Sequence, residues 1–415
     1  MLTFFRRTLV LALSLALIAP ATPVWARETT KHWLPAFYAA PEPSGSTDAI
    51  ISDMTLRQIV RVSAGGERVR VRLSNAYGDK PLRLEDVRMA RRTTGSGIDL
   101  ASDRGLTFNG RVGVTIAPGA YVLSDPADIK VAAGSDLAIS LYAKDPVPLK
   151  TVHDIQRGVL YRMTGAQAAA ERFAEETINI GLGNAFPFVA GVEVESAKPL
   201  STVIAFGDSI TDGFGITPDT GWTWPDVLNA RLRDAKLPVN VINAGISGNR
   251  MLHHGTWARF GTGALARFDR DVLSQNVQAV IVLIGINDLG HAKSPEAEDY
   301  VSAQDMIGGL KQMALRARAR NMKIYVATLT PFKGTVFKDY YTDHKESERQ
   351  ALNAWLRQSQ DFDGVFDFDK ALEDPARPEW LRAEYDLGDH LHPNDTGAAA
   401  IAQAIPLSAF GWAQK

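Results

Sequence analysis

Residues 203–210, Val-Ile-Ala-Phe-Gly-Asp-Ser-Ile, join a short apolar run to an abrupt polar turn. Four apolar residues in succession are typical of a strand that is buried on both faces of a parallel sheet. The Gly-Asp-Ser that follows predicts a turn from this strand into a helix, with the hydroxyl of Ser209 at the turn. Four more such runs follow, separated by helical patterns, so residues 200–412 predict an α/β domain around a five-stranded parallel sheet.

The predicted strands and helices of this domain alternate along the chain. Parallel strands need such crossovers, and ligands bind beyond the carboxyl ends of the strands. Helices are therefore expected on both faces of the sheet, and a binding site is expected at one edge. The predicted strands are 203–206, 239–242, 280–284, 324–327 and 365–368, and the predicted helices lie near 222–236, 262–275, 300–320 and 344–360, with a last one after Asn394.

Residues 28–195 have a different pattern and predict a β-rich domain. Short runs in which apolar and polar residues alternate are separated by Gly, Pro and Asp, which is typical of a β-sandwich or jelly roll. The alternation around Val60 and the one around Val71 flank Gly65-Gly66, which predicts a hairpin. An Ala-rich stretch at 167–176 predicts a helix. The change between the two domains falls at 193–199.

Composition limits the function. The chain has 415 residues, which favours two domains. Lys and Arg number 45 and Asp and Glu number 47, so no basic excess is available for nucleic-acid binding. Cysteine is absent, which excludes disulfides, a thiolate nucleophile and thiolate metal sites. The sequence does not indicate an oligomeric state.

The N-terminus predicts a targeting segment. Arg6 and Arg7 precede an apolar stretch, 9–19, that is too short to span a bilayer, and Val24-Trp25-Ala26 offers small residues at a cleavage site. Residues 1–26 are therefore interpreted as a signal peptide, with a membrane anchor as the alternative. No later stretch is apolar enough to cross a membrane. An exported protein, periplasmic or secreted, is expected.

Polar residues follow the predicted strands at the edge where ligands bind. Ser209 follows the first strand, Gly245 the second and Asn287 the third, while Asp389 and His392 lie in a loop after the fifth. A serine hydroxyl needs a neighbouring base, and an imidazole needs a carboxylate to orient it. Ser209, His392 and Asp389 are the catalytic candidates. The oxyanion donors expected are the amides of Ser209 and Gly245 and the side chain of Asn287.

The surroundings of Ser209 and His392 favour one kind of serine hydrolase. An α/β-hydrolase elbow has glycine two residues after the serine, where this chain has Thr211. Instead, the sequence resembles the SGNH/GDSL hydrolase superfamily in four blocks. They are Gly207-Asp208-Ser209-Ile210, Gly245, Gly285-x-Asn287-Asp288 and Asp389-x-x-His392.

The resemblance covers roughly residues 200–410 and implies a flavodoxin-like three-layer α/β/α fold and ester hydrolysis without a metal or cofactor. It implies the same roles for Ser209, Gly245, Asn287, Asp389 and His392. The β-rich N-terminal domain and the run 245–253 resemble the bacterial two-domain branch similar to acetyl-xylan esterases.

The expected function is that of an exported serine esterase that removes short acyl groups, above all acetyl, from carbohydrate, with a small-molecule or polysaccharide ester as the substrate. A lipase, lysophospholipase or thioesterase of the same superfamily is the alternative, and a non-catalytic carbohydrate-binding protein is a remote one.

Other polar and aromatic residues near these motifs are further candidates. Asp208, His253 and Trp257 are candidates for the substrate cleft, with loop or structural roles as alternatives. His390 is the rival base, and His390 and His392 with Asp386 or Asp389 offer an alternative metal site.

Overall fold

The carboxyl-terminal part is built on one parallel sheet with the strand order β20-β19-β21-β22-β23. The computed structural model describes residues 32–45, 49–154, 158–173, 185–196 and 198–414, and the predicted signal peptide lies outside them. The order 2-1-3-4-5 is that of flavodoxin-like folds. This confirms the predicted sheet, whose strands are β19 (Ser201–Gly207), β20 (Val239–Gly245), β21 (Ala279–Leu283), β22 (Lys323–Ala327) and β23 (Gly364–Phe366).

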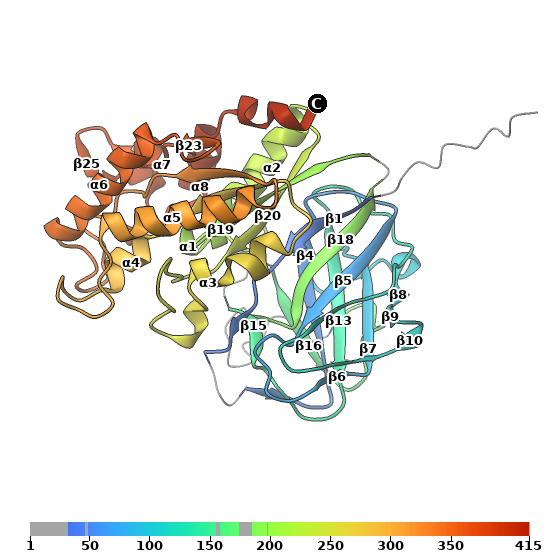
Figure 1. The fold of residues 1–415 in the computed structure, drawn as a ribbon. Helices are drawn as coiled ribbons and strands as arrows, with labels where there is room; N and C mark the ends of the chain where they lie inside the picture. The colour runs from blue at the N-terminus through green and yellow to red at the C-terminus, as the bar shows by residue number, and fades with distance from the viewer. Residues whose placement is uncertain (1–31, 46–48, 155–157, 174–184, 197, 415) are drawn as a thin grey trace, which may run out of the picture. The chain divides into compact units, whose positions relative to one another are not determined.

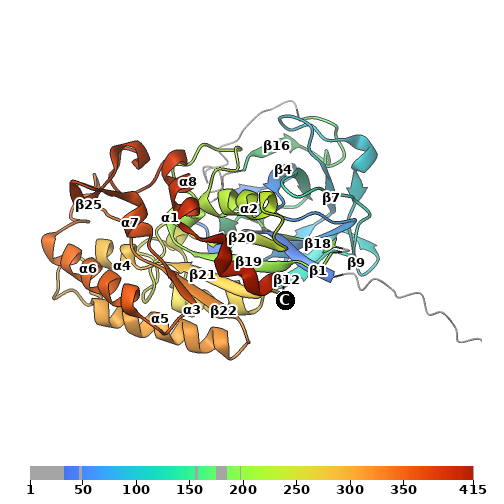
Figure 2. The same ribbon diagram turned by 90° about the horizontal axis from the view of Figure 1, so that it is seen from above.

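Helices cover both faces of this sheet, as Figures 1 and 2 show. Helices α2 and α8 pack together on one face, and α3 and α5 lie on the other, with α6 against α5. The predicted three layers are therefore present. The helices are α1 (Ser209–Asp212), α2 (Trp224–Asp234), α3 (Ala264–Phe268), α4 (Ile286–His291), α5 (Ala303–Arg318), α6 (Asp343–Gln358), α7 (Phe368–Leu372) and α8 (Asp395–Ala404), with a π turn η3 (Asp269–Leu273) and 3-10 turns η2 (Ala258–Phe260), η4 (Ala383–Tyr385) and η5 (Leu407–Gln414).

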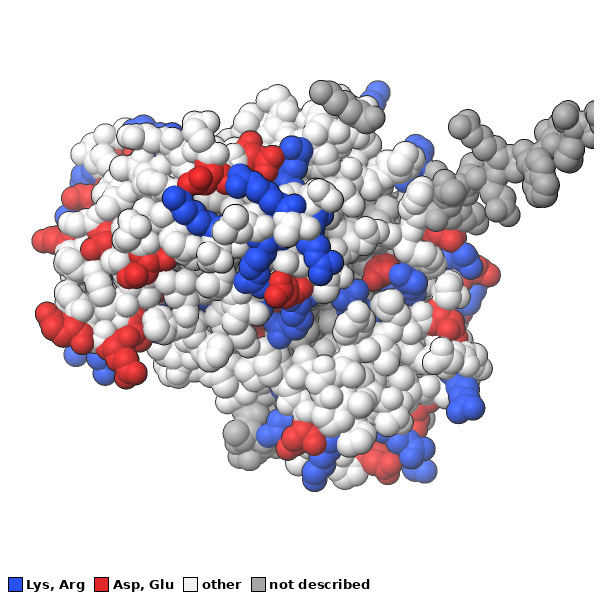
Figure 3. All heavy atoms as spheres, viewed as in Figure 1, with Lys and Arg blue, Asp and Glu red and all other residues white. Residues whose placement is uncertain are grey.

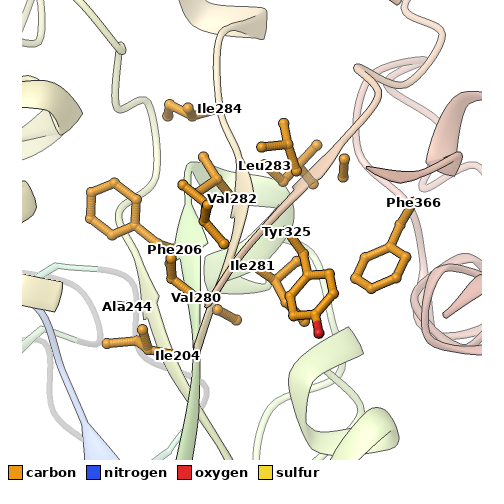
Figure 4. Close-up of a cluster of buried hydrophobic side chains, with 14 of the residues drawn as sticks. Ile204, Phe206, Ala244, Val280, Ile281, Val282, Leu283, Ile284, Tyr325 and Phe366 are labelled. Atoms are coloured by element: carbon orange, nitrogen blue, oxygen red, sulfur yellow. The ribbon is translucent and has the colours of Figure 1, made fainter. Parts of the chain in front are cut away.

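The central strands form the core between these layers (Figure 4). Ile204 and Phe206 of β19 and Val280 and Val282 of β21 are completely buried. Strands buried on both faces explain the uninterrupted apolar runs of the sequence. Phe206 also packs edge-on against Phe268 of α3, with ring centroids 5.5 Å apart. This packing fixes the carboxyl end of β19, the strand that leads into Ser209.

The N-terminal part contains two larger antiparallel sheets, ordered β1-β18-β5-β12 and β16-β4-β13-β7-β8. Side chains of both, such as Val71 and Ile139, belong to one buried apolar cluster. The sheets therefore pack face to face, as the predicted sandwich requires. Their strands are β1 (His32–Tyr38), β4 (Met54–Arg61), β5 (Arg68–Ser74), β7 (Asp86–Arg91), β8 (Arg104–Gly105), β12 (Tyr121–Leu123), β13 (Asp136–Ala143), β16 (Leu160–Thr164) and β18 (Val189–Ser196).

Shorter strands complete the N-terminal part and the region near the carboxyl terminus. They are β2 (Glu42–Pro43), β3 (Ile50–Ile51), β6 (Leu82–Leu84), β9 (Thr107–Phe108), β10 (Arg111–Val112), β11 (Val114–Ile116), β14 (Val147–Pro148), β15 (Thr151–His153), β17 (Phe186–Pro187), β24 (Glu373–Asp374) and β25 (Arg377–Leu381), with a 3-10 turn η1 (Leu100–Ser102).

The predicted hairpin at Gly65-Gly66 is wrong, because the chain crosses there from β4 in one sheet to β5 in the other. Glycine is needed at both positions because neighbouring backbone leaves no room for a side chain. A Cβ on Gly65 would lie 2.9 Å from the carbonyl oxygen of Val131, and one on Gly66 would lie 2.7 Å from that of Glu195. The alternation of side chains correctly placed the strands but did not show that they pair with different partners.

The helix predicted at 167–176 is also wrong for its described part, 167–173, which forms turns and bends. The buried guanidinium of Arg57 explains the difference. It donates hydrogen bonds to the carbonyl oxygens of Ala168 and Ala170, at 3.2 and 2.7 Å. A side chain of β4 thus binds carbonyl groups that a helix would use internally.

Charges of both signs lie on the face shown in Figure 3, where a group of Lys and Arg lies near Asp and Glu. Many charged side chains of the described residues are paired, for example Arg316 Nη2 with Asp269 Oδ1 at 2.8 Å. The mixture agrees with the near-zero net charge of the sequence. In the portion of the chain that the structure describes, no helix is long and apolar enough to cross a bilayer.

A buried acid in β2 makes the stability of the protein depend on pH. Glu42 is 2 % exposed, and its Oε1 accepts a hydrogen bond from the amide of Asp154. Burial raises the pKa of Glu42 from 4.5 to about 8. The folded chain therefore keeps a proton that the unfolded chain releases, and this stabilisation is complete below pH 4.5 and is lost as the pH rises towards 8.

Glu42→Gln keeps the shape of the neutral acid without the proton. Between pH 5 and 8, roughly the interval between the two pKa values, we expect the free energy of unfolding of Glu42→Gln to fall less steeply than that of the wild type. Urea titration at each pH measures this free energy. Identical slopes for the two proteins would contradict the raised pKa.

Candidate active site

Ser209 lies where β19 turns into the short helix α1. Asp208 caps this helix, and its side chain accepts a hydrogen bond from the amide of Ile210 at 3.1 Å. A cap of this kind fixes the first helical residue, which here is Ser209. Ser209 is 5 % exposed and lines a pocket at the carboxyl edge of the sheet.

His392 reaches Ser209 from a loop 183 residues further along the chain. Its Nε2 lies 2.8 Å from Ser209 Oγ, and its Nδ1 lies 2.6 Å from Asp389 Oδ2. The other oxygen of Asp389 accepts hydrogen bonds from the amides of Leu391 and His392, at 3.0 and 2.8 Å. These bonds hold the Asp389–His392 turn, and Asn394 then caps α8.

The carboxylate of Asp389 stays ionised in this position. Burial alone would raise its pKa, but hydrogen bonds from the ring and amide of His392 and from the amide of Leu391 lower it below its ordinary value. An ionised Asp389 selects the tautomer of His392 with the proton on Nδ1. Nε2 is then unprotonated and faces the hydroxyl of Ser209.

A second Asp–His pair in the same loop faces elsewhere. His390 Nδ1 contacts Asp386 Oδ2, and the His390 ring packs edge-on against Trp380 at 5.7 Å between centroids. His390 is absent from the pocket that contains Ser209. The alternative metal site is not formed, since no cluster of three or more ligand side chains occurs among the residues that the structure describes.

Asn287, at the start of α4, lines the pocket beside Ser209 and has its amide group fixed. Its Oδ1 accepts a hydrogen bond from the hydroxyl of Tyr340 at 2.8 Å, and its Nδ2 donates to the carbonyl oxygen of Asn249 at 3.0 Å. An amide nitrogen carries two hydrogens, so one donor remains for a ligand. The carbonyl oxygen of Asn249 can only accept, so it determines which end of the Asn287 amide is the donor, and the hydroxyl of Tyr340 donates to the other end.

The expected oxyanion donor at Gly245 is not available. Its amide donates to Asn243 Oδ1 at 2.8 Å, and Gly245 is not among the pocket-lining residues. The glycine is needed for packing, because a Cβ there would lie 2.2 Å from the amide nitrogen of Asp212. Gly248, three residues later, lines the pocket instead, and its amide has no hydrogen-bond partner among the described residues.

The pocket has a volume of about 530 Å³ and is mostly apolar. The ring of Phe214 lies 4.4 Å from that of His392, measured between centroids, and Phe337 packs edge-on against the same imidazole at 6.1 Å. Phe214 and His291 could not be singled out from the sequence, because neither belongs to a recognised block. Gly248 lies within the run 245–253, but the sequence pointed to Gly245 as the donor of that run. The aromatic and charged lining residues are Phe214, Trp257, Arg259, Phe260, His291, Lys293, Phe337, Lys338, Asp339 and Tyr340.

Of the three candidate cleft residues, one lines the pocket and two do not. Trp257 is 61 % exposed and lines the pocket, whereas His253 does not line it. Asp208 is completely buried and also lies outside it, so its assignment to the cleft is wrong and its role as a cap is the observed one. Burial raises the pKa of Asp208 to about 7.

Asp288 is structural too, accepting hydrogen bonds from the amides of Met251 and Leu252, at 2.5 and 3.0 Å.

His291 forms part of the pocket wall as a neutral imidazole. Burial lowers its pKa to about 4, and Nε2 has no hydrogen-bond partner among the described residues. Its ring lies between Phe260 and Tyr340, with centroids 5.6 Å from each. His291 therefore contributes no charge to the pocket at neutral pH.

Replacement of Asn287 tests the oxyanion donor. We expect Asn287→Ala to lower kcat by about 10²–10³ with little change in KM, because the lost hydrogen bond forms in the transition state. Asn353→Ala, which removes another buried amide outside the pocket, is the control and should leave kcat of the folded protein unchanged. Steady-state hydrolysis of p-nitrophenyl acetate measures both. Equal kcat in the two variants would contradict the assignment.

A hydroxyl, an imidazole and a carboxylate joined in this order are the arrangement that serine hydrolases use. Residues 205–400 match the model of the GDSL-like Lipase/Acylhydrolase family. This segment forms a GDSL-like lipase/acylhydrolase domain, and the protein is a carboxylic ester hydrolase. No curated protein matches the chain in sequence.

Solved structures resemble about half of the chain. The acetyl xylan esterase AlAXEase is 21 % identical over 49 % of this chain and 96 % of its own, with a TM-score of 0.38. A GDSL-like lipase from Bacteroides thetaiotaomicron is 18 % identical over 50 % of this chain and 87 % of its own, with a TM-score of 0.36. The psychrotrophic esterase EstA from Pseudoalteromonas sp. is 16 % identical over 52 % of this chain and all of its own, with a TM-score of 0.37.

Proposed function

We propose that this protein is an exported serine esterase that removes short acyl groups, above all acetyl, from carbohydrate. Ser209 is the nucleophile, His392 the general base and Asp389 the residue that orients it. The observation that carries the proposal is the continuous chain of contacts from Ser209 Oγ through both ring nitrogens of His392 to Asp389. The three groups are joined at the wall of a pocket large enough for an ester.

The proposed reaction uses these groups in two half-reactions. Ser209 Oγ attacks the ester carbonyl while His392 Nε2 takes its proton, and the oxyanion is stabilised by the amides of Ser209 and Gly248 and the side chain of Asn287. His392 then protonates the leaving alcohol, which gives an acyl-enzyme. Water activated by the same imidazole hydrolyses the acyl-enzyme, and Ser209 is regenerated.

The shape of the pocket supports a substrate that is bulkier than a simple acetate ester. A volume of about 530 Å³ leaves room for more than an acetyl group beside Ser209. The exposed ring of Trp257 offers an aromatic face at the pocket, on which the apolar face of a sugar ring can stack. A short acyl group with a carbohydrate alcohol fills such a pocket from both sides of the ester.

The apolar lining also favours a second candidate, an esterase for longer acyl chains, such as a lipase or thioesterase. A series of p-nitrophenyl esters from acetyl to dodecanoyl separates the two. We expect the highest kcat/KM for acetyl and a decrease with each longer chain. A maximum at octanoyl or beyond would contradict the short-acyl proposal and leave the serine chemistry in place.

The carbohydrate part of the proposal is tested with natural esters. Acetate release from acetylated xylan and from acetylated monosaccharides is expected for the wild type, and Trp257→Ala is expected to lower it while p-nitrophenyl acetate hydrolysis changes little. Polysaccharide binding without acetate release would instead favour a binding protein. Export is tested by sequencing the N-terminus of the mature protein, which should begin at Arg27 after cleavage following Ala26.

A further inference from the structure

A buried histidine of the N-terminal sheets reaches the helix that carries Ser209. His153, the last residue of β15, is 4 % exposed. Its Nε2 lies 3.1 Å from Oδ1 of Asp212, the last residue of α1, and its Nδ1 lies 2.9 Å from the carbonyl oxygen of Ala40. The side chain therefore connects the β-rich part of the protein with the active-site helix.

Both ring nitrogens of His153 face atoms that accept hydrogen bonds. The carbonyl oxygen of Ala40 is an acceptor only, and Asp212 already accepts two hydrogen bonds from Ser247 with Oδ2, as a carboxylate does. An imidazole that donates from both nitrogens is an imidazolium. Burial alone would lower the pKa of His153, but the Asp212 carboxylate raises it to about 9. The contact is thus a buried ion pair.

Asp212 also contacts the turn that contains Gly248, through the neighbouring residue Ser247. Its Oδ2 accepts hydrogen bonds from the amide of Ser247 at 3.0 Å and from the hydroxyl of Ser247 at 2.5 Å. Ser247 and Gly248 both line the pocket beside Ser209. The position of the Gly248 amide relative to Ser209 therefore depends on where the Asp212 carboxylate is held.

We propose that His153 is a positioning residue for ester hydrolysis, which acts through Asp212 on the Ser247–Gly248 turn. This inference rests on the proposed function of the site. Through His153 and Asp212, the β-rich part then helps to hold the Gly248 amide, the proposed oxyanion donor, in position. Because the oxyanion forms only in the transition state, loss of this support should lower kcat and leave KM nearly unchanged.

Two substitutions of His153 separate its two hydrogen bonds. In His153→Gln, the amide nitrogen stands near the place of Nε2 and can still donate to Asp212. In His153→Asn, the amide nitrogen stands near the place of Nδ1, so the bond to Ala40 is kept and the bond to Asp212 is lost. We expect kcat of His153→Asn to fall by about 10–100-fold and that of His153→Gln to stay within about threefold of the wild type.

A purely structural role predicts a different result. Each variant loses one hydrogen bond and the buried charge, so their melting temperatures should fall alike, and activity lost through unfolding would fall alike as well. A kcat for folded His153→Asn within threefold of the wild type, or an equal loss of kcat in both variants, would overturn the proposal (the threefold limit being about 0.65 kcal/mol).

Ser247→Ala keeps the proposal testable if His153→Asn does not fold. It leaves the His153–Asp212 pair intact and removes only the hydroxyl contact of the turn. We expect kcat to fall about tenfold at an unchanged KM, and an unchanged kcat would overturn the proposal. A wild-type protein that hydrolyses no ester would overturn the proposed function with it, whereas an active wild type with unaffected variants would overturn this inference alone.

Discussion

Ser209→Ala is expected to lower kcat for p-nitrophenyl acetate by about 10⁶, the loss that follows when the nucleophile of a Ser-His-Asp site is removed. The oxyanion donors and the pocket remain, so KM should change little. The loss is large because Ser209 Oγ is the atom within 2.8 Å of His392 Nε2, and no second hydroxyl among the described residues makes such a contact.

The control for this variant is Ser201→Ala, at the start of β19, the strand that leads into Ser209. It should have wild-type kcat and a similar melting temperature. Near-wild-type turnover of a folded Ser209→Ala protein would remove Ser209 as the nucleophile. Activity that disappears from both variants would show that strand β19 had been disrupted.

Asp389→Asn is expected to lower kcat by about 10⁴, the effect known for the orienting aspartate of such sites. An amide at this position can donate to Nδ1 of His392, which places the imidazole proton on Nε2. His392 then cannot accept the proton of Ser209. The measurement is kcat of the purified variant across pH 6 to 9, with folding checked by circular dichroism.

The neighbouring Asp–His pair provides a matched control. His390 has a positive φ of 59°, which asparagine tolerates, so His390→Asn preserves the turn while it removes the rival imidazole. This variant should keep kcat within about threefold of the wild type. A loss comparable to that of Asp389→Asn would mean that the base had been assigned to the wrong histidine.

Much of the catalytic half could be predicted from the sequence, because its signals are local. Five apolar runs predicted the strands. Because the carboxyl ends of parallel strands lie at one edge of a sheet, the residues that follow them, Ser209, Asn287 and His392, could be placed in one site. The spacing of Asp389 and His392 sufficed for their contact, because both lie in one turn. Each of these steps needs only the order of the elements along the chain.

The assignment of Gly245 failed for a reason that the sequence does not contain. Gly245 ends strand β20 and Gly248 lies three residues beyond it, and only the three-dimensional path of the chain decides which of the two lines the pocket with an amide unpaired among the described residues. The side chain of Asn243 occupies the Gly245 amide, and the tight packing on Asp212 accounts for the glycine. A glycine required by packing and a glycine required by a ligand look the same in a sequence.

The N-terminal half was predictable in class but not in its connections. Alternating residues showed strands, yet the pairing of β4 and β5 with different sheets depends on distant partners such as β13 and β18. The contact between His153 and Asp212 joins residues 59 positions apart that carry no shared motif. Long-range contacts of this kind follow from the packing of whole sheets.

Labelling with a fluorophosphonate probe, followed by mass spectrometry of the peptides, tests whether Ser209 is the nucleophile activated by His392. We expect one adduct per chain, on the peptide that contains Ser209, and its loss in His392→Asn, where the base is missing. An adduct on another serine, or none on a folded wild-type protein that still hydrolyses p-nitrophenyl acetate, would contradict it.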